Sequence, residues 1–504
     1  MERKKMNYRL YNIIKLNFGW RKFVYGLFVV SILFLVQCSD RIDHVEEISK
    51  EASIFPDYYD LTIPANIAPL NFIIREEGSE YKINIHGKKG SQIEINQHSA
   101  KVVISETKWH QLLSENKGDS ITIEIWSYNK SRWNKFKSIQ HYIAPELIDE
   151  YLSYRLVYAS YLKWAKMGIY QRNLSNFDET PVIENETIDY ACVNCHTFSD
   201  NDPDKFMMHF RIFNAGTLIK NGDKLEKFNM KATNALSAGI YASWSPNGKY
   251  LAFSTGKIAP HMTTRLNKTV DVADKSSDLM IYDVEHNRLE IPPQLATERR
   301  ENLPLWSADG RYLYFTSAPE AIENDFESRL HARYDLMRIE FNENTNEWGN
   351  IDTLVSSSKT KKSISMPSAS PDGRYISCSM SDYGYFTIFH KESDLYLIDT
   401  KTGEYKKMEL NSDETESYSS WSSNSRWLVF SSKRLDGVLT RPYIAYIDKN
   451  GSAHNAFLLP QKNPEMYNQL LANYNLPEMI KGKINITPFE IRNKISEEPI
   501  KVIQ

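Results

Sequence analysis

Two cysteines and a histidine stand together in the stretch DYACVNCHTFSD, residues 189–200. Two residues separate Cys192 from Cys195, and His196 follows directly. Thiols and an imidazole at this spacing can attach a covalent haem, supply half of a zinc site or form a redox dithiol. So short a pattern can also arise by chance. The compartment of the chain and the neighbouring elements decide between these interpretations.

The spacing favours covalent haem c. Each thiol can bond one vinyl group of the same porphyrin, and the histidine then binds the iron from one face. In this respect residues 192–196 resemble the haem-binding motif of the cytochromes c. A structural zinc site needs four ligands, and the sequence offers no second cysteine or histidine pair. A thioredoxin-like dithiol begins a helix after a strand, whereas this one follows a polar loop.

The second axial ligand of such an iron is expected to be His209, because a short intervening loop closes at a low entropic cost and imidazole is the commonest metal ligand. His261, Met207 and Met208 are second choices. Two histidines would give a low reduction potential, and a methionine would raise it. The loop SDNDPD, residues 199–204, could hold calcium but lacks the spaced glutamate of an EF-hand, so a solvated loop is favoured.

The N-terminus carries an export signal. Residues 1–22 are strongly basic, and the apolar run that follows is shorter than the roughly 20 residues of a membrane-spanning helix. The sequence Leu35-Val36-Gln37-Cys38 resembles the lipobox of bacterial lipoproteins, although Gln37 departs from the usual small residue. The resemblance implies a signal peptide over residues 1–37, a lipid on Cys38, and a membrane-attached protein exported to the periplasm or outer membrane. An uncleaved anchor and a buried helix are the alternatives.

Composition excludes some classes of protein. A formal net charge of −3 over 504 residues leaves no dominant basic face, so no nucleic-acid partner is expected. Apart from Cys38, only Cys192, Cys195 and Cys378 remain, too few for a disulfide framework. Cys378 lies in a predicted strand and is expected to be a buried apolar residue. The 30 tyrosines and 10 tryptophans indicate β-rich structure.

Apolar periodicity divides the first half of the chain. After a polar linker at 38–54, alternation with a period of two over 55–142 predicts a small β-sandwich. From Pro145 the apolar residues recur every three to four positions and predict a helix. That helix belongs to a connector, residues 143–209, which also holds the haem segment. Residues 461–504 are predicted to form a C-terminal helix, at 464–474, and a closing tail.

A repeat occupies the second half. The stretch SWSPNGKYLAF at 243–253 recurs as LWSADGRYLYF at 305–315, SASPDGRYISC at 368–378 and SWSSNSRWLVF at 420–430. Each copy combines a tight turn with a buried strand, and periods of this length are typical of propellers. The repeat resembles the TolB-type β-propellers, which are related in style to WD-repeat blades. The resemblance implies a propeller over 210–460, with six blades favoured, in a mainly β protein.

Two functions are compatible with these features. The first is a membrane-anchored extracytoplasmic c-type haem protein for electron transfer or redox sensing, with a redox partner. The second is a protein-binding or assembly module of the envelope, with haem auxiliary or absent, since TolB-type propellers are associated with protein contacts. The sequence has no G-x-S-x-G, H-E-x-x-H or P-loop motif, which disfavours a hydrolytic enzyme without excluding one.

Overall fold

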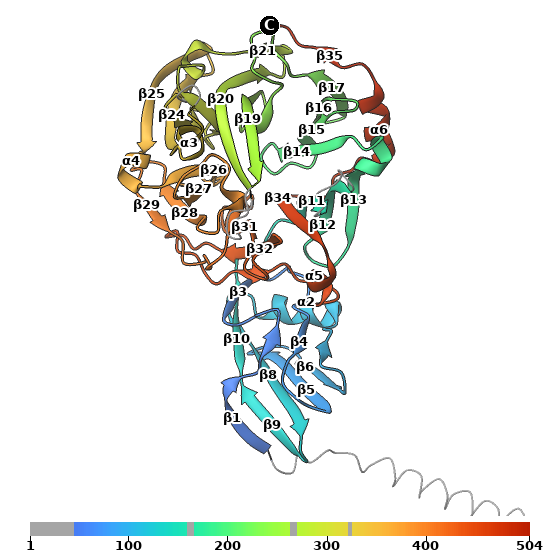
Figure 1. The fold of residues 1–504 in the computed structure, drawn as a ribbon. Coiled ribbons are helices and arrows are strands. Elements are labelled where there is room, and N and C mark those ends of the chain that lie inside the picture. Colours follow the sequence, from blue (N-terminus) through green and yellow to red (C-terminus); the bar gives the residue numbers. More distant parts are fainter. Residues whose placement is uncertain (1–44, 159–165, 263–269, 321–324) are drawn as a thin grey trace, which may run out of the picture.

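The computed structural model describes residues 45–158, 166–262, 270–320 and 325–504. A disc of β-sheets stands on a narrower β-domain at the N-terminal side (Figure 1). The predicted signal peptide and Cys38 lie outside the described residues. Within those residues, no helix is both long enough and apolar enough to cross a membrane.

The N-terminal domain is a β-sandwich, as the alternation predicted. The strand β5 shows why: its residues alternate regularly between buried and part-exposed positions. Residues 45–54, predicted as linker, instead begin the domain, because β1 pairs with β9 in parallel. The large sheet contains β1 (Val45–Glu51), β9 (Arg132–Lys137), β8 (Ser120–Asn129), β10 (Ile139–Ala144), β3 (Leu61–Pro64), β5 (Glu80–Gly87) and β6 (Ile93–Gln97); the small one contains β2 (Ile54–Phe55), β4 (Phe72–Ile74) and β7 (Lys101–Val102), beside helix α2 (Glu106–Glu115).

The remainder is a β-propeller of six blades, which confirms the predicted class and blade number. From the innermost strand outward, blade 1 contains β34 (Ala472–Ile480), β11 (Tyr151–Tyr158), β12 (Met167–Asn173) and β13 (Glu179–Glu184), and blade 2 contains β14 (Cys192–Phe198), β15 (Lys205–Arg211), β16 (Gly216–Asn221), β17 (Lys224–Asn229) and the short β35 (Ile500–Lys501). In the same order, blade 3 contains β18 (Ile240–Trp244), β19 (Tyr250–Met262), β20 (Val270–Asp283) and β21 (Arg288–Glu290), and blade 4 contains β22 (Arg300–Trp306), β23 (Tyr312–Ala318), β24 (Asp335–Asn342) and β25 (Glu347–Val355). Blade 5 contains β26 (Ser363–Ala369), β27 (Tyr375–Ser381), β28 (Asp394–Asp399) and β29 (Tyr405–Lys407), and blade 6 contains β30 (Glu416–Trp421), β31 (Trp427–Ser432), β32 (Arg441–Tyr446) and β33 (Phe457–Leu458).

Short helices complete the chain between and after the blades. They are η1 (Asn185–Ile188), η2 (Pro293–Leu295), α3 (Phe326–Leu330), α4 (Ser357–Thr360), η3 (Thr387–Phe389), α5 (Met466–Gln469) and α6 (Pro488–Ser496).

The helix predicted from Pro145 is wrong, and so is the boundary of the propeller. Residues 151–158 and 167–173 form β11 and β12, so the propeller begins near residue 151 rather than at 210. The physical reason is a partner far away in the sequence, because β34, from the C-terminal segment, pairs antiparallel with β11. Such pairing supplies β11 with partners on both sides and overrides its local helical pattern. The predicted helix at 464–474 likewise shrinks to α5, because β34 begins at Ala472.

The two domains share one hydrophobic core. Buried residues of the sandwich, of blade 1 and of blades 5 and 6 form a single contiguous cluster. Hydrogen bonds cross the same boundary: the Tyr58 hydroxyl donates to the carbonyl of Leu458 at 3.1 Å, and Trp427 Nε1 donates to the carbonyl of Glu146 at 3.2 Å. Because apolar burial and hydrogen bonds coincide there, the domains pack as one unit.

Candidate functional site

The central channel of the propeller is the candidate site. Its cavity of about 190 Å³ is lined by three consecutive residues from the innermost strand of each blade. These residues are 195–197, 241–243, 303–305, 366–368, 418–420 and 476–478. The CVNCH segment therefore lies on the channel wall, as part of β14, and not in a connector outside the blades.

A β-bulge turns these residues toward the axis. The ladder between the innermost strand and its neighbour is irregular at this level in every blade. In five strands the first lining residue has a left-handed φ between 47° and 52°, and Cys195 occupies the matching place in β14. A bulge adds one unpaired residue and re-aims its side chain. The five left-handed residues are Tyr241, Leu303, Met366, Tyr418 and Leu476.

An apolar lid covers this end of the channel. Leu303, Met366 and Tyr418 belong to one buried cluster with Val272, Tyr385 and Ile388. Tyr241, Leu476 and Val270 pack against that cluster. Val270 and Val272 come from β20, the second arm of a long hairpin. The hairpin β19–β20 therefore reaches across the channel mouth. Its other arm carries His261, paired with Asp271, and Met262, paired with Val270.

The two cysteines lie in different surroundings. Cys192 is 1% exposed and packs in an apolar cluster between blades 1 and 2, whereas Cys195 lines the channel. Both thiols are free. Burial raises the pKa of the Cys195 thiol, although Arg155 and the backbone N–H of Tyr241 lower it in part. A raised pKa is the opposite of what a reactive thiolate needs, so a redox dithiol is disfavoured.

His196 is a buried imidazole that makes no hydrogen bond to the described residues. Its side chain is 2% exposed, and neither ring nitrogen has a hydrogen-bond partner among the described residues. The ring meets Phe198 edge-on, with centroids 5.8 Å apart. Burial and, secondarily, the Arg155 charge lower the pKa of His196 to about 3. The imidazole is thus neutral at physiological pH and keeps a free nitrogen lone pair, the state that binds a metal. An unsatisfied buried polar group is costly, so this histidine needs a reason to be there.

The predicted second ligand, His209, lies on the wrong face of the blade. His196 pairs with Met208, so both point toward blade 1, and the next residue, His209, points the other way. The neighbouring clusters agree, because Met208 packs with blade 1 and Met207 with blade 3. His209 Nδ1 is also engaged with Thr217 Oγ1 at 3.0 Å. The sheet itself therefore separates His209 from His196, and both methionines are packing residues.

Glu478 is a channel residue that the sequence did not indicate. It lies on β34 and lines the cavity together with Cys195 and His196. One carboxyl oxygen accepts hydrogen bonds from Phe198 N at 3.2 Å and Thr197 Oγ1 at 3.3 Å. Burial raises the pKa of Glu478 to about 8, so the carboxyl group is mostly protonated at neutral pH. No motif surrounds it, and only the closure of blade 1 brings it here.

The remaining predicted residues are structural. In the loop 199–204, Asp200 pairs with Lys481 at 2.8 Å and Asp204 with Lys220 at 3.2 Å. Among the described residues, no group of three or more His, Cys, Asp or Glu side chains is placed to hold a metal ion. Cys378 is fully buried in an apolar cluster, as expected.

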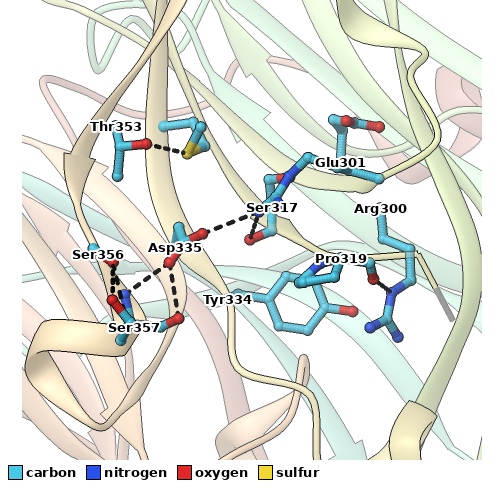
Figure 2. Close-up of polar contacts among 12 residues, drawn as sticks. Arg300, Glu301, Ser317, Pro319, Tyr334, Asp335, Thr353, Ser356 and Ser357 are labelled. Carbon is cyan, nitrogen blue, oxygen red and sulfur yellow. Dashed lines mark hydrogen bonds and ion pairs between the residues drawn. The ribbon is translucent and has the colours of Figure 1, made fainter.

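A second polar cluster lies in blade 4 and is structural as well (Figure 2). The Asp335 carboxylate accepts hydrogen bonds from Ser357 N and Oγ, both at 2.8 Å, and from Arg299 at 3.0 Å. The Arg300 guanidinium lies over the Tyr334 ring, 5.6 Å from its centroid. These contacts tie β24 to α4 and to the start of β22.

Fold and site together define a six-bladed propeller protein with an N-terminal β-sandwich and a CVNCH strand on its channel wall. No protein-family model and no curated protein matches the chain. Among solved structures it is similar to a nidogen/laminin complex (7% identity, TM-score 0.38, 66% of this chain and 100% of that one). It is also similar to a luciferin-regenerating enzyme (11%, 0.34, 58% and 86%) and to the β-propeller domain of Myceliophteria thermophila Cps50 (Swd1) (11%, 0.29, 53% and 86%). Because these TM-scores are low, the propeller assignment depends on the sheet topology.

Proposed function

We propose that this chain is an exported c-type haem protein for electron transfer or redox sensing, with its haem at the mouth of the propeller channel. The observation that carries the proposal is the buried, neutral and unpartnered imidazole of His196 directly beside the channel-facing Cys195. Histidine-ligated haem supplies one-electron chemistry whose potential follows the second ligand and the burial of the iron.

The donor residues fit this group in part. Cys195 and His196 border the same cavity, so one thioether and one axial ligand suit the described packing. The thiol of Cys192 packs in the apolar cluster of blade 1, and attachment through it requires residues 192–194 to leave that cluster. The cavity is also smaller than the roughly 300–1,000 Å³ of typical ligand sites, so a porphyrin must displace the lid. The hairpin that bears His261 belongs to that lid, which favours this second choice over His209.

Covalent haem is tested on the full chain, produced with haem c maturation machinery and denatured before haem staining and pyridine haemochrome spectroscopy. We expect covalent haem in the wild type and in Cys378→Ala, the matched buried thiol of blade 5. Cys192→Ala together with Cys195→Ala should abolish it. The proposal fails when the wild type carries no haem, or when the double variant keeps the wild-type absorbance.

Membrane attachment through a lipid on Cys38 is the second part of the proposal, supported by the basic and apolar N-terminal pattern. Cys38→Ser should block lipidation and slow processing of the precursor. Normal processing of this variant, with full solubility of the wild type, would contradict it.

Exposed apolar side chains favour a docking function as the second candidate. Tyr190, Ile212 and Phe213 are 55%, 56% and 58% exposed and lie at the Cys192 end of the β14–β15 hairpin. Exposed aromatic and aliphatic groups at one place are typical of protein contacts. Phe213→Ser should remove an envelope cross-link that survives the control Phe489→Ser, since Phe489 lies elsewhere, on α6, and is 65% exposed. Identical cross-linking of both variants would exclude docking there.

A further inference from the structure

Two arginines beside the CVNCH strand have no carboxylate partner among the described residues. Arg155, on β11, donates from Nη1 to the carbonyl of Asn194 at 2.8 Å, to Asn194 Oδ1 at 3.1 Å and to the carbonyl of Val193 at 3.4 Å. All three acceptors are neutral. Its Nε atom is buried and has no hydrogen-bond partner among the described residues. One edge of the guanidinium thus binds β14, and the other edge makes no hydrogen bond to the described residues.

Arg211 lies across the same strand. It ends β15, pairs with Cys192 in the ladder, and its Nη2 atom is 3.6 Å from Cys192 Sγ. The side chain is otherwise exposed. Within the described part of the chain, neither Arg155 nor Arg211 forms an ion pair with a carboxylate. The charges of both arginines lower the pKa values of Cys195 and Tyr241, two residues that line the channel.

Other arginines of the propeller use both terminal nitrogens or a carboxylate partner, although Arg172 and Arg441, like Arg155, leave Nε without a hydrogen-bond partner among the described residues. Arg172 donates from Nη1 to Gln461 Oε1 at 2.7 Å and from Nη2 to the carbonyl of Pro460 at 2.6 Å. Arg441 likewise donates from both terminal nitrogens to backbone carbonyls. Arg434 is paired with the buried Glu416 at 3.0 Å. Arg155 differs, because its bonds to described residues all leave from a single nitrogen.

We propose that Arg155 and Arg211 form a binding site for an oxyanion, a carboxylate or phosphate group, beside the start of β14. A planar guanidinium with one free edge matches two oxygens of such a group, and charge-assisted hydrogen bonds of this kind are strong. The carboxylate can come from a dissolved anion or from the propionates of a bound haem. The site itself does not depend on the haem proposal, since both arginines stand there without it.

The test uses the full chain, prepared without haem attachment, and calorimetric titration with inorganic phosphate and with succinate at constant ionic strength. We expect saturable binding of at least one anion. Arg155→Gln and Arg211→Gln should each weaken it by about tenfold or more. The exposed Arg311→Gln in blade 4 should leave it unchanged. Circular dichroism and the melting temperature identify any variant that fails to fold.

The outcomes separate the two sources of the anion. Binding to the haem-free chain but not to the haem-loaded chain assigns the site to the haem propionates. Binding to both forms, or to a chain that never carries haem, assigns it to a dissolved anion. The proposal is overturned when neither anion binds the haem-free chain, or when Arg155→Gln, Arg211→Gln and Arg311→Gln bind with equal affinity.

Discussion

At the scale of one residue, the burial of His196 predicts the direction in which the free energy of unfolding changes with pH. Its pKa is lowered to about 3, below the ordinary value of 6.5, so the unfolded chain binds the proton first as pH falls. Its contribution to stability is therefore complete above pH 6.5 and is lost toward pH 3, by about 1.4 kcal/mol per pH unit. His196→Phe should reduce the loss of unfolding free energy between pH 7 and pH 5, measured in urea on the haem-free chain.

His286 is the matched control for that measurement. It is exposed, and its hydrogen bond with Asp283 raises its pKa, so its stabilisation is present at low pH and lost as pH rises. His286→Phe should therefore shift the pH dependence in the opposite direction. His141 and His209, both with a pKa lowered to about 4, keep their acid sensitivity in either variant. An unchanged profile for His196→Phe would mean that this ring is not buried.

The stability that Glu478 contributes changes with pH in the opposite direction to that of His196. Its pKa is raised from 4.5 to about 8, so the stability that it contributes is complete below pH 4.5 and declines as pH rises through 8. Glu478→Gln keeps an acceptor for Phe198 N and removes the titration. The melting temperature of Glu478→Gln should stay constant between pH 6 and pH 8.5, whereas that of the wild type should fall over the same range. A parallel fall in both proteins would place the carboxyl group in water.

The sequence predicts some channel residues and misses others for a physical reason. The sequence predicted Cys195 and His196 because the signal for their chemistry is the spacing of residues along one strand. Glu478 and Arg155 carry no local pattern: Glu478 lines the channel, and Arg155 contacts β14, only because β34 closes blade 1 against β11. His209 was misplaced because a short loop sets proximity along the chain but not the face of a strand, which alternates with every residue.

At the scale of elements, the turns of the repeat make a second kind of prediction. Gly310 and Gly373 have φ values of 71° and 72°, and an added Cβ would meet its nearest neighbours at 3.4 Å and 3.5 Å, ordinary contact distances. The cost of alanine is then purely conformational, about 1 kcal/mol. Gly482→Ala, where an added Cβ would meet Pro203 at 3.7 Å and φ is not left-handed, should be nearly neutral. Equal destabilisation at all three positions, measured by urea unfolding, would contradict this account.

The least regular repeat shows how an element tolerates a departure. Ser425 stands where the other turns carry glycine, and it adopts a φ of 61°. Its hydroxyl accepts a hydrogen bond from Asp372 N in the next blade at 2.9 Å, which offsets the strain. Turn signals of this kind are local, and they predicted four blades correctly. Blade 1 escaped prediction because β11 has helical spacing and its partner strand lies more than 300 residues away.

At the scale of the whole molecule, the shared core predicts that the two domains unfold together. Trp427, on blade 6, is fully buried, meets Tyr446 at 5.1 Å between ring centroids, and donates its indole N–H to Glu146 at the end of the sandwich. Trp427→Ala should cost about 3–5 kcal/mol, since a buried tryptophan leaves a large cavity. Trp133→Ala, at the far end of the sandwich, should cost less because its side chain is only half-buried.

Differential scanning calorimetry checks the coupling. The wild type should show a single transition, and Trp427→Ala should lower it while raising proteolysis between residues 144 and 150, where the domains join. The single transition follows from a continuous core, because neither domain can expose its face of that core without cost to the other. Two transitions in the wild type, of which only one responds to Trp427→Ala, would show that sandwich and propeller fold independently. In that case the sandwich is a spacer, and the channel site belongs to the propeller alone.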